Sequence, residues 1–303
     1  IRSLQFLSSN PRERIGLIGG EPTLHPELKR MLAALIDSPF SSVCLFTNGI
    51  LLDRYFTELR NSKFQILVNL NAPEKTGTAQ YNRIMDNLDQ MIHHLYMKDQ
   101  IGLGLNLYEP DMDFSYIIEA LKRFRQKKLR VSVAVPNAEN ERHVDPLSYF
   151  RSMKKTIRKL LIQLLELDIA PNFDCNYLPP CLLEPEDKEL LQTYSSTMKR
   201  SNLMHIHPIC SPVLDILPDL QVVRCFGMSN LYRVPLRNFK NTEDLKRHFL
   251  LEMDALAYHI LPNSACENCC QYLSGKCSCG CYAYRLPAIR KLRKELKTKE
   301  WVK

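Results

Sequence analysis

The chain has 303 residues and a mass of 35.2 kDa, and 45% of its residues are hydrophobic and 24% are charged. This composition excludes a disordered or collagen-like chain and is enough for one large domain or two smaller ones. Even the most apolar segment, Leu160 to Ala170, contains Gln163, Glu166 and Asp168, so we expect no membrane span. The 41 basic and 33 acidic residues give a net charge of +8, which would suit an anionic partner such as RNA.

Short apolar segments alternate with amphipathic segments through the first half of the chain. The predicted strands run from Arg14 to Gly19, Ser42 to Thr47, Phe64 to Leu70, Ile101 to Tyr108 and Arg130 to Val135. The predicted helices run from His25 to Ile36, Asp53 to Arg60, Ala79 to Met97, Phe114 to Gln126 and Pro146 to Asp168. This alternation predicts a parallel sheet, either doubly wound or part of a barrel, with ligands at the carboxyl ends of its strands.

The carboxyl ends of the predicted strands are small or polar. The first strand leads into Gly19-Gly20-Glu21-Pro22, and the second ends at Thr47-Asn48-Gly49. Two adjacent glycines let a ligand approach the backbone closely, and a carboxylate beside them can bind an ammonium group. The candidate contacts on the later strands are Asn69, Asn71 and Asn106.

The cysteines are concentrated in the second half. Cys44 is alone in the first half, within a predicted strand, where we expect it to serve in packing. The other ten lie between Cys175 and Cys281, a distribution that favours a metal-binding domain in a reducing cytoplasm over a disulfide scaffold. Between Cys210 and Cys225, the Pro218-Asp219 pair predicts a hairpin.

Close cysteine pairs end this region. They are Cys266-x2-Cys269 and Cys277-x3-Cys281, with Cys270 and Cys279 as additional thiols and His205 and His207 as rival ligands. Such pairs let four thiolates converge without a large core, as iron-sulfur and zinc sites both require. The spacing alone does not distinguish iron-sulfur clusters from zinc.

The segment Ile18-Gly19-Gly20-Glu21-Pro22-Thr23-Leu24-His25-Pro26 resembles the second-strand motif of radical S-adenosylmethionine (radical SAM) enzymes, and Leu45-Phe46-Thr47-Asn48-Gly49 follows at a typical distance. The resemblance covers about Arg14 to Pro136. It implies an α/β fold, a partial (β/α)6 TIM-like barrel, over residues 1–170. It also implies that the motif binds S-adenosylmethionine. The implied cofactor contacts are Gly19, Gly20, Glu21 and Pro22, with Asn69, Asn71 and Asn106 on the following strands.

The family's CxxxCxxC motif, which binds the 4Fe-4S cluster that cleaves S-adenosylmethionine, is not found in this sequence, and no cysteine precedes Cys44. We expect that motif, with the first strand segment of the barrel, to precede Ile1, in preference to a naturally cluster-free relative.

Residues 171–303 resemble the SPASM domain, which carries auxiliary iron-sulfur clusters, and end in a basic helix. Cys210 and Cys225 match the family's first cysteine pair, with Leu220 in place of its glycine. The later pairs match the second part, with seven residues instead of five between Cys269 and Cys277. The family's last cysteine is missing.

The resemblance implies one or two auxiliary 4Fe-4S clusters. Cys210, Cys225 and Cys281 would bind one, and Cys266, Cys269 and Cys277 the other. Each cluster needs one more ligand: Cys175 and Cys181 are the expected supply for the first, and Cys270 or Cys279 for the second.

The resemblance therefore predicts an enzyme that cleaves S-adenosylmethionine reductively to a 5′-deoxyadenosyl radical and modifies a peptide or protein, as an oxidoreductase or maturase. Its electron donor would be of the flavodoxin or ferredoxin type. The alternatives are a radical SAM enzyme acting on RNA or a small metabolite, and a non-catalytic iron-sulfur or zinc-binding relative. No catalytic acid or base is assigned, because the available residues are expected at surface or capping positions: His25, Glu109, Asp111 and Asp174.

Overall fold

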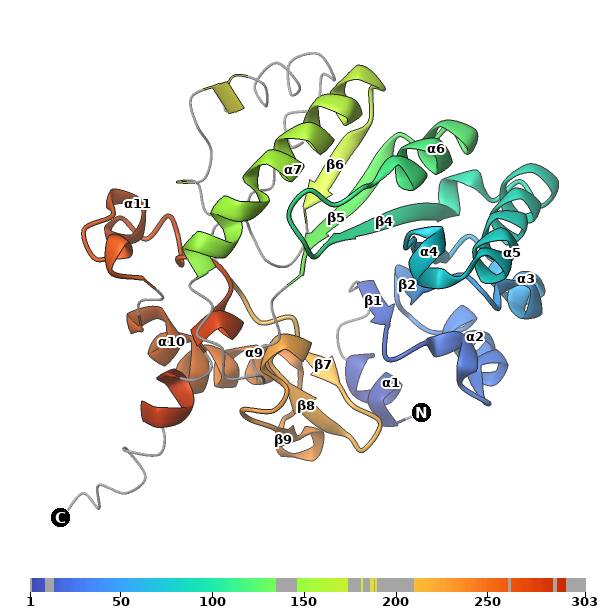
Figure 1. Ribbon diagram of the computed structural model, residues 1–303. Coiled ribbons are helices and arrows are strands. Elements are labelled where there is room, and N and C mark those ends of the chain that lie inside the picture. Colours follow the sequence, from blue (N-terminus) through green and yellow to red (C-terminus); the bar gives the residue numbers. More distant parts are fainter. Residues whose placement is uncertain are drawn as a thin grey trace.

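The computed structural model describes residues 2–8, 14–134, 146–173, 181, 186–187, 189, 210–260, 263–285 and 288–292. Within these ranges the protein is a mixed α/β structure with a six-stranded parallel sheet and a smaller three-stranded antiparallel sheet (Figure 1). No helix in the described part of the chain has the length and apolar character needed to cross a membrane.

The parallel sheet follows the chain in order, β1-β2-β3-β4-β5-β6. Its strands are β1 (Arg14–Leu17), β2 (Ser42–Thr47), β3 (Phe64–Asn69), β4 (Ile101–Leu107), β5 (Lys128–Val133) and β6 (Ala170–Phe173). All five predicted strands are present. The sixth, β6, was not predicted, because four residues that include Pro171 give too short an apolar pattern. It pairs with β5, so the sheet continues past the predicted domain boundary at residue 170.

Helices lie between successive strands of the first half, as predicted. They are α2 (Leu28–Ile36), α3 (Phe56–Leu59), α4 (Pro73–Thr76), α5 (Thr78–Asp89), α6 (Ser115–Arg123) and α7 (Pro146–Glu166). An additional helix, α1 (Arg2–Leu7), precedes β1 and was not predicted. Short 3-10 turns cover Pro22–Leu24, Leu52–Tyr55 and Lys98–Gln100, and a π turn, Gln90–His94, extends α5.

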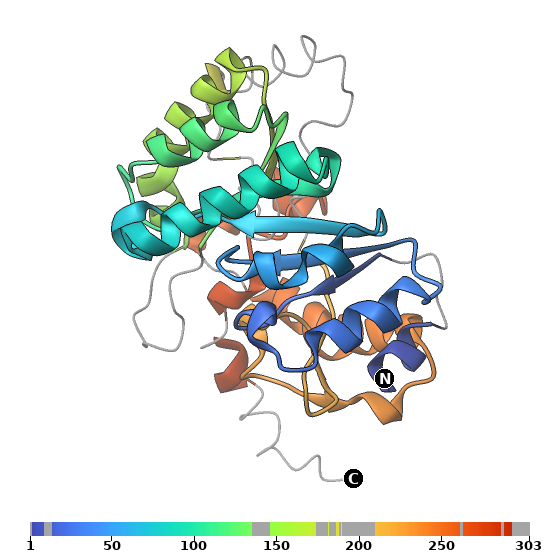
Figure 2. The same ribbon diagram turned by 90° about the vertical axis from the view of Figure 1, so that its right-hand side faces the viewer.

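The strand order decides between the two predicted sheet types. A doubly wound sheet reverses its strand order once, and this order has no reversal. Right-handed crossovers that all advance in one direction place their helices on one face. In Figures 1 and 2, α2, α5, α6 and α7 accordingly lie on the outer side of the curved sheet. The sheet is open, and closure into a barrel is not observed.

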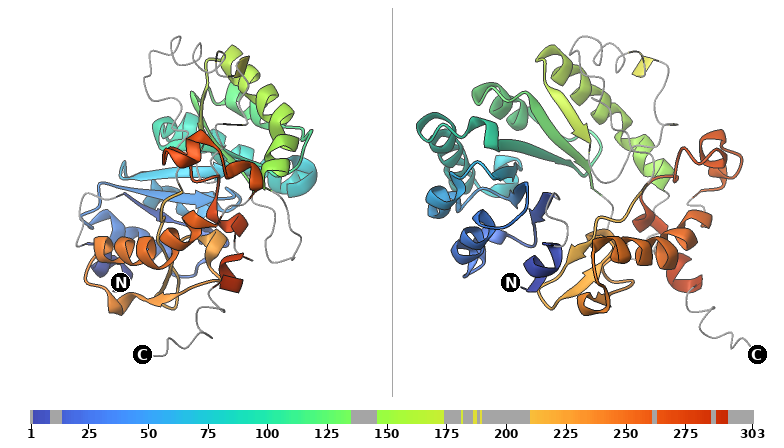
Figure 3. Two further views of the ribbon diagram at one scale, coloured as in Figure 1. Left: turned by 90° about the vertical axis from the view of Figure 1, so that its left-hand side faces the viewer. Right: turned by 180° about the vertical axis from the view of Figure 1, so that it is seen from behind.

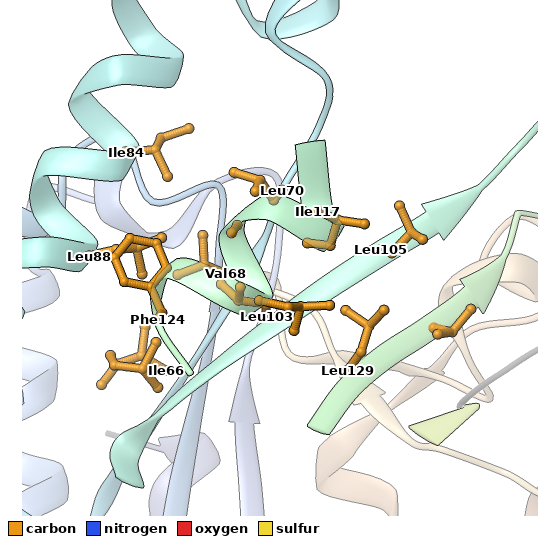
Figure 4. Close-up of a cluster of buried hydrophobic side chains, with 14 of the residues drawn as sticks. Ile66, Val68, Leu70, Ile84, Leu88, Leu103, Leu105, Ile117, Phe124 and Leu129 are labelled. Atoms are coloured by element: carbon orange, nitrogen blue, oxygen red, sulfur yellow. The ribbon is translucent and has the colours of Figure 1, made fainter. Parts of the chain in front are cut away.

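Burial alternates along the strands in agreement with this one-sided cover. On β3, Phe64, Ile66 and Val68 are buried, whereas the residues between them are half-buried or exposed. The buried set joins the helices in one hydrophobic core. Figure 4 shows part of it, with Val68 and Leu103 of the sheet facing Leu88 of α5 and Phe124, the residue that follows α6. The opposite face of the sheet is left to polar and half-buried residues.

The second half forms a separate hydrophobic core around Val222, Leu245, Phe249 and Tyr282. Its elements are β7 (Asp215–Ile216), β8 (Gln221–Val223), β9 (Val234–Pro235), α9 (Thr242–Phe249), α10 (Ala255–His259) and α11 (Cys270–Leu273). A π turn, Leu250–Asp254, joins α9 to α10, and 3-10 turns cover Phe226–Met228, Leu236–Asn238, Ser264–Cys266 and Tyr282–Arg285. Residues 288–292 are helical, and the rest of the predicted basic tail lies outside the described residues.

The predicted hairpin is confirmed. Asp215 pairs with Val223 across β7 and β8, and Leu220 N–H donates to the Leu217 carbonyl at 2.9 Å to close the Pro218-Asp219 turn. Leu220 has a φ of 61°, the left-handed region that favours glycine. The SPASM motif that this segment resembles has a glycine at the position of Leu220, and the turn requires the left-handed conformation at that position.

The amino-terminal helix α1 packs against both cores. Its Leu4 and Leu7 contact the first core and its Phe6 contacts the second, and α1 lies beside the β7–β9 sheet in both views of Figure 3. The two halves of the chain are therefore connected through α1 as well as through the chain that follows β6.

Candidate functional site

The Gly19-Gly20 pair follows the carboxyl end of β1 and is open to solvent. Both glycines are exposed, and a Cβ atom added to either would meet no atom within 4 Å. Among the described residues, no hydrogen bond engages their carbonyl groups. The backbone here can accept a ligand at close range, which is what the adjacent glycines predict.

The Glu21 carboxylate joins this loop to the end of β2. Its Oε1 accepts hydrogen bonds from Thr23 N–H at 3.0 Å, Thr23 Oγ1 at 2.6 Å and Thr47 Oγ1 at 2.7 Å, and its Oε2 accepts from Asn48 N–H at 2.7 Å. Because three donors occupy Oε1, a ligand ammonium group has access to the carboxylate only at Oε2. Glu21 therefore positions the loop first, and Pro22 starts the 3-10 turn that follows it.

The Thr47-Asn48-Gly49 turn is fixed from both sides. Asn48 Oδ1 accepts from Ile50 N–H at 2.9 Å, and Asn87 of α5 donates to the Gly49 carbonyl at 2.9 Å. Gly49 has a φ of 82°, and a Cβ there would lie 2.9 Å from Val68 Cγ1, so the turn requires glycine. The loops after β1 and β2 thus form one hydrogen-bonded unit at the carboxyl edge of the sheet.

A polar row crosses the sheet face that the helices leave uncovered. Arg130 of β5 donates through Nη1 to Asn69 Oδ1 at 3.2 Å and to Asn106 Oδ1 at 2.8 Å. It reaches Asn69 across Gly104, which stands between them in the strand register and has no side chain to block the contact. The structure therefore brings together two of the three predicted asparagines.

Asn71 is not part of this row. It is exposed in the loop after β3, where its carbonyl accepts from Thr76 Oγ1 at 3.5 Å. Arg130 was not predicted as a site residue. The available signal was its position: a charged residue between Leu129 and Val131 in an apolar strand faces the opposite side from both.

Cys44 lies in β2 and is half-buried. Desolvation raises the pKa of its thiol to about 11, so it is protonated at neutral pH. This agrees with a packing role.

One group of thiols consists of Cys210, Cys225 and Cys281. The thiols of Cys210 and Cys281 hydrogen-bond to each other, and this bond, with the nearby Arg224 guanidinium, lowers the pKa of Cys210 to about 6. Arg224 Nη1 also lies 3.8 Å from Cys225 Sγ, and the charges of Cys210 and Cys225 influence one another. These three residues form the first predicted set of ligands.

A second group consists of Cys266, Cys269, Cys277 and Cys279. The Cys279 thiol hydrogen-bonds to the thiols of Cys277 and Cys266, and the charge of Cys269 acts on Cys266. The bond from Cys279, with the backbone N–H groups of Cys279 and Gly280, lowers the pKa of Cys277 to about 6. Cys279 thus contacts two of the three predicted ligands of the second set, Cys266 and Cys277.

Cys181 is exposed, and its pKa is raised first by desolvation and then by the charges of Cys277, Cys266 and Cys269. The charges that act on it are thus those of the second group and not those of the first group, for which it was expected as a ligand. That expectation came from closeness in sequence to Cys210, which carries no spatial information over the intervening segment. Cys175, His205 and His207 lie outside the described residues.

No three histidine, cysteine, aspartate or glutamate side chains of the described ranges are arranged to hold a metal ion. The donors in both groups are thiols, the ligand type that zinc and iron-sulfur clusters take. Buried positive charge lies beside these thiols.

Two guanidinium groups are buried beside the thiols. Arg224, 1% exposed, forms a bidentate ion pair with Asp254, in which Nη2 donates to Oδ2 at 2.8 Å. Arg285, 2% exposed, donates only to the carbonyls of Ala257 and Ser278, and its Nε has no partner among the described residues. A buried cation without a carboxylate is costly unless another anion lies near it. Thiolates, bare or bound to a cluster, would supply that charge.

The candidate acid and base residues of the first half lie in turns and on the surface. His25 Nδ1 accepts from Glu27 N–H at 3.1 Å in the turn before α2, as expected for a turn residue. Glu109 lies 4.0 Å from Lys75 in an exposed ion pair, and Asp111 is exposed with a φ of 56°. Asp174 lies outside the described residues. The geometry singles out none of these as a catalytic group.

No family model matches the chain, and no curated protein matches it.

We expect the Glu21→Gln substitution to lower the free energy of unfolding by about 1–3 kcal/mol. An amide –NH2 would replace one carboxylate oxygen, and in either orientation it would face a backbone N–H, that of Thr23 or that of Asn48. Urea unfolding of the variant measures this. Glu27→Gln, in an exposed pair with Arg30, is the control and should be nearly neutral. An equal effect of both substitutions would contradict the positioning role of Glu21.

The Gly104→Ala substitution should cost about 1–3 kcal/mol of stability. The added Cβ would lie 2.5 Å from Asn69 Oδ1 and would displace this side chain from Arg130. Gly102→Ala on the same strand is the matched control, because its Cβ would lie 3.3 Å from the flexible end of Leu67 and at an ordinary contact distance of 4.0 Å from the Ile66 carbonyl oxygen. Urea unfolding of both variants tests the polar row, and a larger loss for Gly102→Ala would refute this account.

Asp215 provides a pH-dependent prediction. Desolvation raises the pKa of its carboxyl from 3.8 to about 6, although Phe226 N–H hydrogen-bonds to it. The folded state therefore takes up a proton more readily than the unfolded state, and the ionised carboxylate destabilises the protein above pH 6. Asp215→Asn should stabilise the protein at pH 7.5 by up to about 3 kcal/mol, and this gain should disappear as the pH falls to about 4.

Urea unfolding of wild type and Asp215→Asn across this pH range gives the difference between their free energies of unfolding. The titration of the thiols contributes equally to both proteins and cancels in this difference. Asp219→Asn, in the exposed turn of the same hairpin, keeps an acceptor for Gln221 N–H and should have little effect at any pH. A gain for Asp215→Asn that does not change with pH would show that charge burial is not its cause.

Proposed function

We propose that this protein is a radical SAM enzyme with a SPASM-like auxiliary cluster domain, in which the first sheet has the role of a partial (β/α)6 barrel. The observation that carries the proposal is the geometry of the Gly19-Gly20-Glu21-Pro22 loop. Its backbone is open at the glycines, and the four hydrogen bonds of Glu21 hold it against the turn after β2.

The shape of the sheet supports this proposal. Ligand sites in parallel α/β structures lie at the carboxyl edge of the strands, where the loops after β1 and β2 meet. The sequential strand order places the described crossover helices on one face of the sheet and leaves the other face free of them, as the inside of a partial barrel requires. The polar row of Asn69, Arg130 and Asn106 lies on that face.

The residues present suit the methionine part of S-adenosylmethionine, which carries an ammonium group and a carboxylate. The carbonyls of Gly19 and Gly20 and the accessible Oε2 of Glu21 would accept from the ammonium group. The Arg130 guanidinium would pair with the carboxylate, and Asn69 and Asn106 hold this guanidinium in place. When bound, the cofactor supplies a 5′-deoxyadenosyl radical that removes a hydrogen atom from the substrate.

The thiol groups suit auxiliary iron-sulfur clusters. A four-thiolate cluster carries a net charge of about −2, and Arg224 and Arg285 are buried beside the thiols. The uncompensated charge of Arg285 favours an anionic group at the Cys266, Cys269 and Cys277 thiols, whose neighbours Cys279 and Ser278 it contacts or influences. Peptide or protein modification, with a flavodoxin- or ferredoxin-type electron donor, follows from the SPASM resemblance.

The test is S-adenosylmethionine binding and cleavage by the protein as its gene encodes it, after anaerobic reconstitution with iron and sulfide. The proposal predicts a CxxxCxxC motif ahead of Ile1, about four irons per chain for that motif's cluster, and release of 5′-deoxyadenosine on reduction. The Gly20→Val substitution should weaken S-adenosylmethionine binding at least about tenfold without loss of stability, because its Cβ meets no atom in the free protein.

Leu24→Ala is the control for that substitution, since Leu24 is exposed on the same loop, and it should bind as wild type does. Binding that is unchanged in Gly20→Val would contradict the assignment of the loop. Absence of cleavage by a reconstituted protein that contains the CxxxCxxC cluster would contradict the enzyme and favour the non-catalytic metal-binding alternative.

A further inference from the structure

Residues 220–242 carry four cations and no acidic residue. One of the cations, Arg224, is buried and paired with Asp254, whereas Arg233, Arg237 and Lys240 are exposed. The segment includes β9, which lies at the edge of the three-stranded sheet in the lower part of Figure 1. This edge of the second half therefore presents positive charge to solvent.

Packed rings bring a fourth exposed cation to this edge. The His248 ring of α9 lies 5.1 Å from the Phe239 ring, and its Nε2 lies 3.0 Å from the Tyr232 hydroxyl. Each of these rings is next in sequence to an exposed cation. Because consecutive Cα atoms are only about 3.8 Å apart, the packed rings hold these cations close to one another. We call this surface the basic face, and it consists of Arg233, Arg237, Lys240 and Arg247.

The charges of the basic face are not neutralised within the described ranges of the chain. The side chains of Arg237, Lys240 and Arg247 form no hydrogen bond or ion pair there. Arg233 donates through Nε to the uncharged Ser229 carbonyl at 3.0 Å. Uncompensated surface cations attract a negatively charged partner.

The nearest acidic residues on α9 have other partners. Glu243 pairs with Lys246 at 3.1 Å, and Asp244 lies in the first turn of the helix, where the partial positive charge of the helix N-terminus attracts it. The basic face therefore keeps its net positive charge.

Exposed apolar side chains border the basic face. Leu250 and Leu251, which are 46% and 67% exposed, begin the π turn after α9. They follow Arg247 by three and four residues, the spacing that places side chains on one side of a helix. Apolar residues bordered by charged ones are typical of protein interfaces. RNA would instead need rings free to stack on bases, and the rings here pack on one another.

A short turn connects the basic face to the first thiol group. In the turn that follows Cys225, Met228 N–H donates to the Cys225 carbonyl at 3.0 Å. The next residue is Ser229, whose carbonyl accepts from Arg233. A protein bound to the basic face would therefore lie beside the thiols of the first group.

We infer that the basic face docks an acidic electron-transfer protein of the flavodoxin or ferredoxin type. The inference rests on the proposed function, which requires an electron donor. The donor is oxidised by one electron for each S-adenosylmethionine that is reductively cleaved. Opposite charges on the two surfaces accelerate association, and salt weakens this attraction.

The test is a charge reversal at two residues, Arg237→Glu with Lys240→Glu. Both side chains are exposed and have no partner in the described part of the chain, so the variant should fold as wild type does. Its affinity for purified oxidised flavodoxin or ferredoxin encoded by the same genome should fall at least about tenfold at low salt. Isothermal titration calorimetry of the full protein measures this, and added salt should weaken binding by wild type more than binding by the variant.

The matched control is Lys98→Glu with Lys122→Glu. Both residues are exposed on the first half, and the change in net charge is the same. This variant should bind the donor nearly as wild type does. An equal loss of affinity in the two double variants would show that net charge, and not the basic face, attracts the donor, and would overturn the inference.

S-adenosylmethionine cleavage gives a second readout. With a limiting concentration of reduced flavodoxin, the Arg237→Glu, Lys240→Glu variant should cleave at least about tenfold more slowly than wild type. With dithionite it should cleave at the wild-type rate, because a small chemical reductant needs no docking surface.

The remaining outcomes separate the inference from the proposed function. Donor binding that is unchanged in the Arg237→Glu, Lys240→Glu variant would overturn the inference and leave the proposed function intact. Loss of transfer RNA binding with unchanged donor binding would also overturn it and assign the face to nucleic acid. If wild type cleaves no S-adenosylmethionine with dithionite, the proposed function fails, and loss of donor binding in the variant would still support the docking surface.

Discussion

The sheet β1–β6 buries one of its faces against helices and leaves the other to polar and half-buried side chains, and the location of the candidate cofactor site depends on this asymmetry. Sequential strand order is its cause, since every crossover advances in the same direction and returns its helix to the same side. The buried face needs the alternation seen on β3, where Phe64, Ile66 and Val68 enter the core. The residues between them are then free to carry polar groups, and Asn69 at the end of the strand does so.

A second constraint places the charged groups of the protein: a charge that is shielded from solvent needs a partner. The half-buried Glu21 has four donors and links two loops. The buried Arg224 pairs with Asp254. Arg285 has two carbonyl acceptors and the ring of Tyr282, but its Nε has no hydrogen-bond partner among the described residues, in the part of the chain where thiols are most concentrated. Arg285 is the informative residue of the three, because natural cores rarely bury a cation whose charge is not compensated.

Five of the six strands of the parallel sheet could be predicted from the sequence, because hydrophobic periodicity and turn residues are local signals. The bounds of β2 agree, those of β3 and β4 differ by one residue, and those of β1 and β5 differ by two. The short strand β6 escaped prediction because its pairing with β5 depends on distant residues. The same limit applies to the sites. Gly19 and Gly20 are recognisable locally, but the contact of Arg130 with Asn69 needs the register of three strands, and the placement of Cys181 needs the fold of the second half.

Ser278 lies between the two thiol groups and is fully buried. Its neighbours in sequence, Cys277 and Cys279, belong to the second group, whereas its hydroxyl accepts a hydrogen bond from the N–H of Cys210 in the first group at 2.9 Å. Its carbonyl accepts from Arg285. One serine thus joins the two thiol groups, and a shift of the backbone at either group acts on the other through its hydrogen bond.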